Sequence, residues 1–156
     1  DVYKRQELLA ENTRFLNPSP YTTLTIPGTA KTIINTSYYN QNNGAIVSES
    51  GRGYTMKDYI QPIITAGGIN AITTKPGGGT ITMSGASVAG AILAGCCALI
   101  IQWAVVDGND PQMYATKLQA YIIRGARKRE GDTYPNRQWG YGILDMQEIF
   151  KSLTNK

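Results

Sequence analysis

The chain has 156 residues, enough for one domain with a sizeable core, and its 42% hydrophobic content is globular and excludes a disordered segment. The net charge is +4, but outside residues 124–129 the basic residues are scattered, which argues against a dedicated nucleic-acid surface. There is no histidine, and the two cysteines are adjacent, so no metal-ligand spacing exists and no imidazole is available as a general base.

The first residues differ from the rest. Residues 1–6 show no continuity with the segment after them, and the chain begins without an initiator Met or a signal-peptide pattern. We interpret residues 1–6 as a non-native scar and residues 7–156 as the portion that belongs to a domain. Glu7–Leu16 is predicted as a short helix or a loop that ends at the proline-containing segment Asn17–Pro20.

Strand patterns dominate the first half. Tyr21–Ile26 alternates, and Ala30–Tyr39 is rich in β-branched and aromatic residues, so both are predicted strands, followed by a polar turn at Asn40–Gly44. Thr73–Gly79 is a glycine-rich turn that lacks the Gly-Lys-Ser/Thr ending of a phosphate-binding loop, which favours a hairpin loop. Thr80–Met83 is then a short strand.

The next stretch is the most informative one. Val88–Val106 contains one strongly polar side chain, Gln102, so as a helix it needs burial on every face. Ser87 precedes it directly. Its hydroxyl is suited to an N-cap, or alternatively to a nucleophile held at the positive end of a buried helix, and the residue types alone leave both open.

After this stretch we expect two further helices. Asp110 is the expected N-cap for a helix whose first turn contains Pro111, and the amphipathic pattern predicts Met113–Arg124 as helical, with Gly125 as its stop. The basic cluster at 124–129 is interpreted as a solvated helix end, where cations are favourable. The last helix is predicted at Met146–Leu153.

The run SGASVAGAILAGCCAL resembles the nucleophile motif of subtilisin-like serine peptidases, S-G-T-S-x-A-x-P-x-x-A-G-x-x-A-L. In this alignment Ser87 takes the place of the nucleophile, Ala86 that of a threonine and Ala91 that of a proline. The matching residues are Ser84, Gly85, Ser87, Ala89, Ala94, Gly95, Ala98 and Leu99.

Three further segments carry the resemblance. Ile46–Thr55 is similar to the family's F-S-S-R-G-P-T, and Ile60–Asn70 to K-P-D-(I/V)-x-A-P-G, although Ile63 and Gly67 stand at the Asp and second Pro. Tyr134–Asp145 resembles the closing W-G-x-G-x-(L/V)-(D/N), whose glycines let the chain pass close to the sheet. The combined motifs resemble the branch from anaerobic spore-forming bacteria that includes the germination proteases and their inactive relatives.

The resemblance implies an α/β fold: the C-terminal part of a three-layer α/β/α subtilase domain, with a mostly parallel sheet and a buried central helix after the nucleophile. It implies a serine endopeptidase that acts on polypeptides with Ser87 as nucleophile. The family's Asp and His precede the serine, and its oxyanion asparagine would lie before Asp1, so neither Asn35 nor Asn40 is that donor. We therefore expect the missing N-terminal part as partner, and no peptidase activity from these residues alone.

Two alternatives stay open. The first is a catalytically degenerate subtilase that acts in germination signalling, which the replacements Ala86, Ile63 and Gly67 favour and Ser87 opposes. The second is a single membrane span over Val88–Val106, whose length just suffices. Against a span, Asp107 follows the run directly and the basic cluster stands well away from it, so we expect no membrane span.

We expect no cofactor, and the sequence says nothing of structural calcium in the rest of a domain. The paired thiols favour a reducing compartment, and the resemblance favours a bacterial cytoplasmic or spore-associated protein over a secreted one.

Overall fold

The computed structural model describes residues 16, 19–55 and 59–154. The scar expected at residues 1–6 and nearly all of the segment expected at 7–16 lie outside these ranges. In chain order the elements are β1 Thr36–Asn40, β2 Ala45–Ile46, β3 Ile64–Gly67, β4 Ala71–Thr74, β5 Thr80–Met83, α1 Ala86–Ile101, the π-helical turn η1 Gln102–Val106, α2 Ala115–Arg124 and α3 Met146–Thr154.

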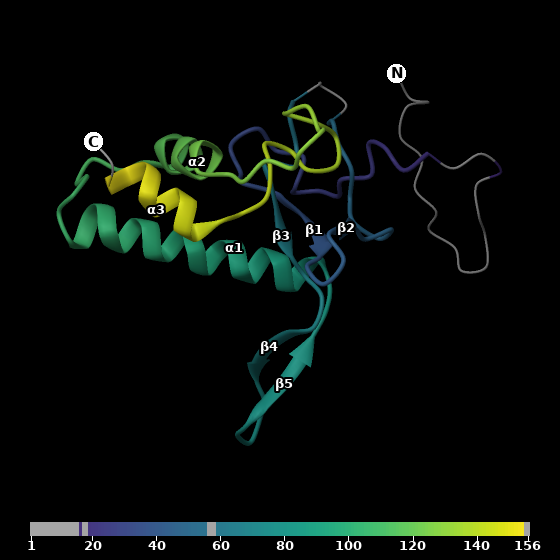
Figure 1. Ribbon diagram of the computed structural model, residues 1–156, viewed down its shortest axis with the longest axis horizontal. Coiled ribbons are helices and arrows are strands. Elements are labelled where there is room, and N and C mark those ends of the chain that lie inside the picture. Colours follow the sequence, from purple (N-terminus) through teal and green to yellow (C-terminus); the bar gives the residue numbers. More distant parts are fainter. Residues whose placement is uncertain (1–15, 17–18, 56–58, 155–156) are drawn as a thin grey trace.

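The main sheet has three strands in the order β2-β1-β3, with β1 antiparallel to β2 and parallel to β3 (Figure 1). The free edge of β3 is extended by the closing loop, because Thr65 forms a parallel bridge with Ile143, and the amide of Leu144 donates to the Thr65 carbonyl at 2.8 Å. A parallel strand pair packed against helices agrees with the expected α/β class.

One face of the sheet packs on α1 through Tyr38, Ala66 and Ala89. The larger core cluster joins the sheet to all three helices, and its buried members are Ile63, Ile64, Leu93, Ile100, Leu118, Ile122, Ala126, Ile149 and Leu153. Fully burying one such aliphatic side chain contributes about 1.5–3 kcal/mol. The helices are therefore held to the sheet by this cluster.

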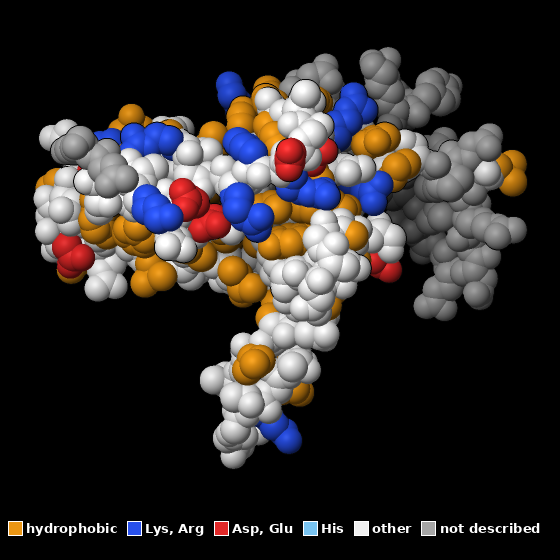
Figure 2. All heavy atoms as spheres, viewed as in Figure 1, with side chains coloured by type: hydrophobic (Ala, Val, Ile, Leu, Met, Phe, Trp, Pro, Cys, Tyr) orange, Lys and Arg blue, Asp and Glu red, His pale blue; other side chains and the backbone are white. Residues whose placement is uncertain are grey.

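Helix α1 departs from the expectation of burial on every face. The described elements that contact it lie on one side of it (Figure 1), so its other side is bare, with Leu99 53% and Ile101 41% exposed. Figure 2 shows hydrophobic side chains along this outer edge. Of the most apolar 18 residues within Ala86–Val106, only 22% are buried. All-round burial is thus wrong for these residues, because nothing described covers the outer face.

By length and composition, Ala86–Val106 is the one helical run among the described residues that could cross a membrane. Core helices of water-soluble proteins pass the same test.

The β4–β5 hairpin projects away from the body (Figure 1), and Ile72 on it is 75% exposed. Its loop turns through Gly77, Gly78 and Gly79, which all have positive φ. This confirms the hairpin loop predicted from the glycines, and β5 has the predicted bounds.

Two strand predictions need correction. Tyr21–Ile26 is not a strand: Thr22 has φ +60°, and although the Thr23 amide donates to the Arg52 carbonyl at 3.0 Å, the segment pairs with no described strand. The strand predicted at Ala30–Tyr39 begins only at Thr36. Before it, the side chain of Asn35 donates to the Gly28 carbonyl at 3.1 Å, and this contact holds the chain in a turn.

The helix predicted at Met113–Arg124 begins at Ala115, with Tyr114 and not Asp110 as its N-cap residue. Residues 110–113 form a separate turn, closed by the Met113 amide on the Asp110 carbonyl at 3.1 Å. Gly125 ends α2, as predicted.

Candidate functional site

Ser87 lies in the first turn of α1, two residues after the N-cap, which is Gly85. The predicted N-cap role of Ser87 is therefore wrong. Gly85 has φ +140°, a conformation that favours glycine, and this lets the chain enter the helix two residues earlier than expected. Once Ser87 is helical, its side chain projects outward from the first turn.

The Ser87 side chain is exposed, and its hydroxyl has no hydrogen-bond partner among the residues that the structure describes. Its backbone N–H likewise has no acceptor there, as expected for the first turn of a helix. The residue therefore combines a free hydroxyl with a free N–H at the positive end of a 16-residue helix.

The turn before Ser87 is fixed to the base of the β4–β5 hairpin. The amide of Asn70 donates to Ser84 Oγ at 2.8 Å, and the amide of Gly85 donates to the Gly68 carbonyl at 2.7 Å. A Cβ on Gly68 would lie 2.9 Å from the Gly85 carbonyl oxygen, so only glycine fits. These contacts hold the start of α1 against the end of β3.

A groove of about 360 Å³ lies between the hairpin and α1, with Ser87 in its wall. Its lining is Ala71, Ile72, Thr73, Met83, Ser87, Val88, Ala91 and Ile92. None of these residues is acidic or basic, so the groove itself supplies no proton acceptor for the Ser87 hydroxyl. As described, the site holds a hydroxyl and a helix terminus but no general base.

The other motif residues serve the fold. The buried Ser50 hydroxyl accepts the Tyr38 amide at 3.0 Å, and the Thr55 hydroxyl accepts the Tyr59 amide at 3.0 Å. Asn40 Oδ1 accepts the Asn42 amide at 3.0 Å in the turn after β1, and Asn35 is bonded to Gly28. Both side chains therefore bond locally, one just before β1 and one at its end.

The closing motif packs against the sheet, as predicted. A Cβ on Gly140 would lie 2.2 Å from the Pro62 carbonyl oxygen, and one on Gly142 would lie 2.7 Å from the Arg127 carbonyl oxygen. Trp139 is 3% exposed and packs on Tyr39 with ring centroids 5.6 Å apart.

The replacements in the K-P-D-like segment are also accommodated by the fold. Ile63, at the acidic position of the motif, is buried in the core, and Gly67 is the last residue of β3. Cys96 and Cys97 are unbridged and half-buried, and burial raises the pKa of both thiols. They are only partly covered because the described residues leave the outer face of α1 bare.

Sequence reasoning missed the groove and the Asn70–Ser84 contact. The sequence did hold one indication of the groove. A hairpin with apolar side chains that directly precedes an apolar helix places two apolar surfaces next to each other. A larger hollow of about 520 Å³ lies at the other end of α1, lined by Trp103 and α2 and far from Ser87.

Comparisons with known proteins agree on one family. The Subtilase family (peptidase S8) profile matches residues 12–142. Comparison with curated protein sequences gives no match. Among solved structures, the chain is similar to the Clostridium perfringens CspB protease, at 37% identity and a TM-score of 0.86 over 92% of this chain.

The maturation proteases PagA (prenylagaramide) and PatA (patellamide) are also similar, each at 26% identity and a TM-score of 0.69, over 86% and 87% of this chain. These matches cover 32% of the CspB chain, 47% of PagA and 48% of PatA. The chain therefore spans about a third to about a half of the length of these structures.

Proposed function

Because this chain belongs to the subtilase family of serine peptidases, we propose that Ser87 is the nucleophile of a serine-type peptidase and that polypeptides are its substrates. The observation that carries the proposal is the state of Ser87: exposed, with an unbonded hydroxyl, at the N-terminus of α1 and in the wall of a groove. No other role for that hydroxyl exists among the described contacts.

In the proposed reaction, Ser87 Oγ attacks the carbonyl carbon of a peptide bond while a general base takes its proton. The carbonyl oxygen becomes an oxyanion, which the free Ser87 N–H at the helix N-terminus is suited to stabilise. The leaving amine then takes a proton as the acyl-enzyme forms, and water releases the acid in a second round.

The base must come from outside these residues, since the sequence contains no histidine and no charged side chain lines the groove. We propose that residues 7–156 are the C-terminal portion of a catalytic domain whose N-terminal part carries the Asp and His. That part would also cover the bare face of α1, which makes α1 a core helix and not a membrane span. Its affinity for Ala86–Val106 would rest on apolar burial.

A fluorophosphonate that labels activated serines tests this proposal. The 156-residue chain alone should label no faster than its Ser87→Ala variant, whereas the chain joined to the N-terminal part of the domain should label rapidly at Ser87. Ser48→Ala is the matched control, because Ser48 is exposed, far from Ser87 in the chain, and bonded to the neighbouring Glu49. Rapid labelling of the chain alone would show that it needs no further base.

The second candidate is a degenerate subtilase that binds partners without cleaving them. Ala86, beside the nucleophile, favours it, because the family's threonine is absent there. In that case the completed domain would still expose Ser87 but would not label, although it would fold and remain soluble without detergent. Recovery of the chain only in detergent-extracted membranes would instead support the span.

A further inference from the structure

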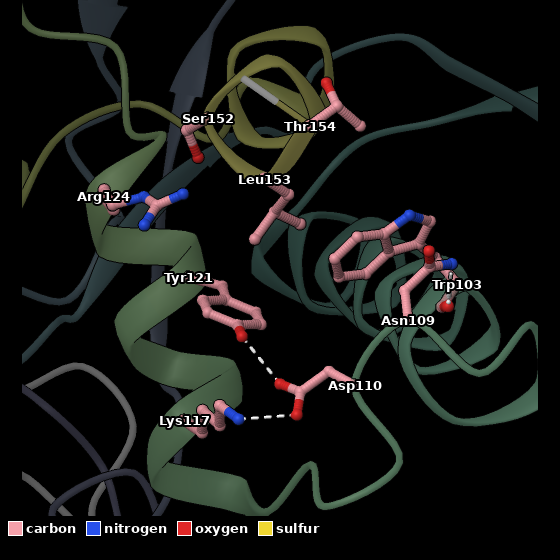
Figure 3. Close-up of a pocket in the computed structure, with 9 residues that line it drawn as sticks. All are labelled: Trp103, Asn109, Asp110, Lys117, Tyr121, Arg124, Ser152, Leu153 and Thr154. Atoms are coloured by element: carbon pink, nitrogen blue, oxygen red, sulfur yellow. Dashed lines mark hydrogen bonds and ion pairs between the residues drawn. The ribbon is translucent and has the colours of Figure 1, made fainter. Parts of the chain in front are cut away.

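The end of α1 opposite Ser87 carries a second hollowed surface, which the proposed peptidase does not use. Ser87 and Trp103 are sixteen positions apart, about 24 Å along the helix axis. A hollow of about 520 Å³ lies here, lined by Trp103 and by residues of α2 and α3 (Figure 3). A second hollow, of about 500 Å³, lies between the end of α2 and α3 and shares Arg124 and Ser152 with the first as lining residues. We call the two together the α2–α3 groove.

The carboxylates of this groove are already paired. Asp110 Oδ1 accepts Lys117 Nζ at 2.6 Å and its Oδ2 accepts the Tyr121 hydroxyl at 2.7 Å (Figure 3). The contact with Asp110 raises the pKa of both Lys117 and Tyr121, as expected of a charged carboxylate held between two donors.

In the second hollow, too, each carboxylate is paired with a cation. The other two carboxylates of the groove pair with two of its other three cations, Arg127–Asp145 at 3.4 Å and Lys151–Glu148 at 2.6 Å. Arg124 is left as the groove's one cation without a carboxylate partner in the part of the chain that the structure describes. Its guanidinium lies near Ser152, where the two hollows meet (Figure 3).

Two hydroxyls that line the first hollow can only accept hydrogen bonds from a ligand. Ser152 Oγ donates to the Ile149 carbonyl at 2.7 Å, and Thr154 Oγ1 donates to the Phe150 carbonyl at 2.9 Å. With their protons committed to α3, both oxygens offer only lone pairs toward the first hollow. A ligand must therefore bring N–H donors to these oxygens and one anionic group to Arg124.

The first hollow also has an apolar wall. Trp103 and Leu153 line it, and Trp103 packs edge-on against Phe150 with ring centroids 6.3 Å apart. Each hollow has the volume of a small-ligand pocket, and since they lie on either side of Arg124, a ligand that fills both must be extended.

We propose that the α2–α3 groove binds an extended peptide segment, with a carboxylate on Arg124 and an apolar side chain against Trp103. A planar guanidinium binds a carboxylate through two parallel N–H···O bonds. A phosphate, with a charge near −2, exceeds the single positive charge that the groove leaves unpaired. The site is independent of the role of Ser87.

The test uses dye-labelled acetyl-Leu-Ala-Glu-Ala-Leu-amide and its Glu→Gln counterpart, with fluorescence anisotropy on the 156-residue chain. A third peptide, acetyl-Leu-Ala-Ala with a free C-terminus, separates a side-chain carboxylate from a terminal one. We expect either carboxylate peptide to bind at least about tenfold more tightly than the Gln peptide, with affinity falling as salt rises.

Arg124→Gln should abolish the preference for the carboxylate peptides. Arg124→Lys should retain only part of it, because an ammonium group lacks the two parallel N–H donors of a guanidinium. Lys75→Gln, at the tip of the distant hairpin, removes the same charge and should change nothing. Trp103→Phe should remove the change in intrinsic emission on binding, while the buried Trp139 still reports the fold. Equal binding of Glu and Gln peptides, no binding at millimolar concentration, or full preference in Arg124→Gln would overturn the proposal.

Discussion

The two ends of α1 differ in how far this chain completes them. At the Ser87 end the groove is apolar and uncharged, and the one reactive group has no partner among the described residues. At the Trp103 end, α2 and α3 pack on the helix and each carboxylate of the groove has its cation. The difference teaches that local packing finishes one end, while the proposed function requires further groups to complete the other end.

The same contrast runs across α1. Its inner face carries residues such as Leu93 and Ile100 in the core, and its outer face leaves Leu99 and Ile101 exposed to water. A helix of this composition is stable in a folded protein only when both faces are covered. Substitutions on the buried face and at the packed end should therefore lower the free energy of unfolding more than substitutions on the exposed face.

The largest effect should come from a pair of neighbours on α1. Ile100→Ala should lower the free energy of unfolding by about 2–5 kcal/mol, because Ile100 is fully buried. Leu99→Ala should cost less than about 1 kcal/mol, because half of that side chain already meets water. Urea unfolding of both variants gives the comparison. An equal loss for both would mean that the outer face is covered in this chain.

Gly125→Ala should destabilise the finished end by about 1–3 kcal/mol. A Cβ there would lie 2.3 Å from Ile149 Cα, so α2 and α3 would have to move apart. Gly95→Ala on the outer face is the control: nothing lies within 4 Å, and alanine should stabilise the helix by about 0.5–1 kcal/mol. Thermal unfolding measures both. A Gly125→Ala variant as stable as the parent would contradict the α2–α3 packing.

Asp110→Asn should cost about 1 kcal/mol, since it weakens two bonds to a charged acceptor. The hydrogen bond to Asp110 and burial together raise the pKa of Tyr121 in the folded state, so its contribution is present below the unfolded value near 10 and is lost as pH rises through the folded pKa. The difference between parent and variant should therefore shrink above about pH 10.

Urea unfolding at about pH 8 and about pH 11, on either side of the tyrosine pKa, measures this change. Asp132→Asn is the matched control, because its pair with Arg129 is exposed and 3.7 Å long and should contribute little. A difference for Asp110→Asn that grows with pH would show that the sign is wrong.

The smallest effect concerns reactivity and not stability. Burial raises the pKa of the Cys96 and Cys97 thiols, so alkylation by iodoacetamide should keep accelerating above about pH 9. Cys96→Ser and Cys97→Ser assign the two rates. An alkylation rate that reaches a plateau below about pH 8.5 would contradict the raised thiol pKa. Slower alkylation after the N-terminal part of the domain is added would show that this part covers α1.

Local chemistry made part of the fold predictable. The glycines of the β4–β5 loop, the stop at Gly125 and the last helix from Met146 were all predicted correctly, because each depends on backbone preference within a few residues. The failures had the opposite cause. Tyr21–Ile26 has strand-forming residues but no partner strand among the described residues, and Asp110 has a capping side chain that bonds to α2 side chains instead.

For the candidate site, the motif around Ser87 identified the family, but it did not show where the side chain would point. That depended on Gly85 and on the hairpin base at Gly68 and Asn70, which are joined to the helix only in three dimensions. The catalytic role of Ser87 stays a prediction until the labelling experiment is done.

By itself the sequence determined the elements with strong local signals, the subtilase family, and the absence of an imidazole, because these are properties of residue types and their spacing. Tertiary structure alone decided that, among the described residues, Ser87 is a free side chain beside a groove, that α1 has one bare face, and that Arg124 is left without a carboxylate. Those are relations between surfaces distant in the chain, and they arise only when packing brings some groups together and leaves others unmatched.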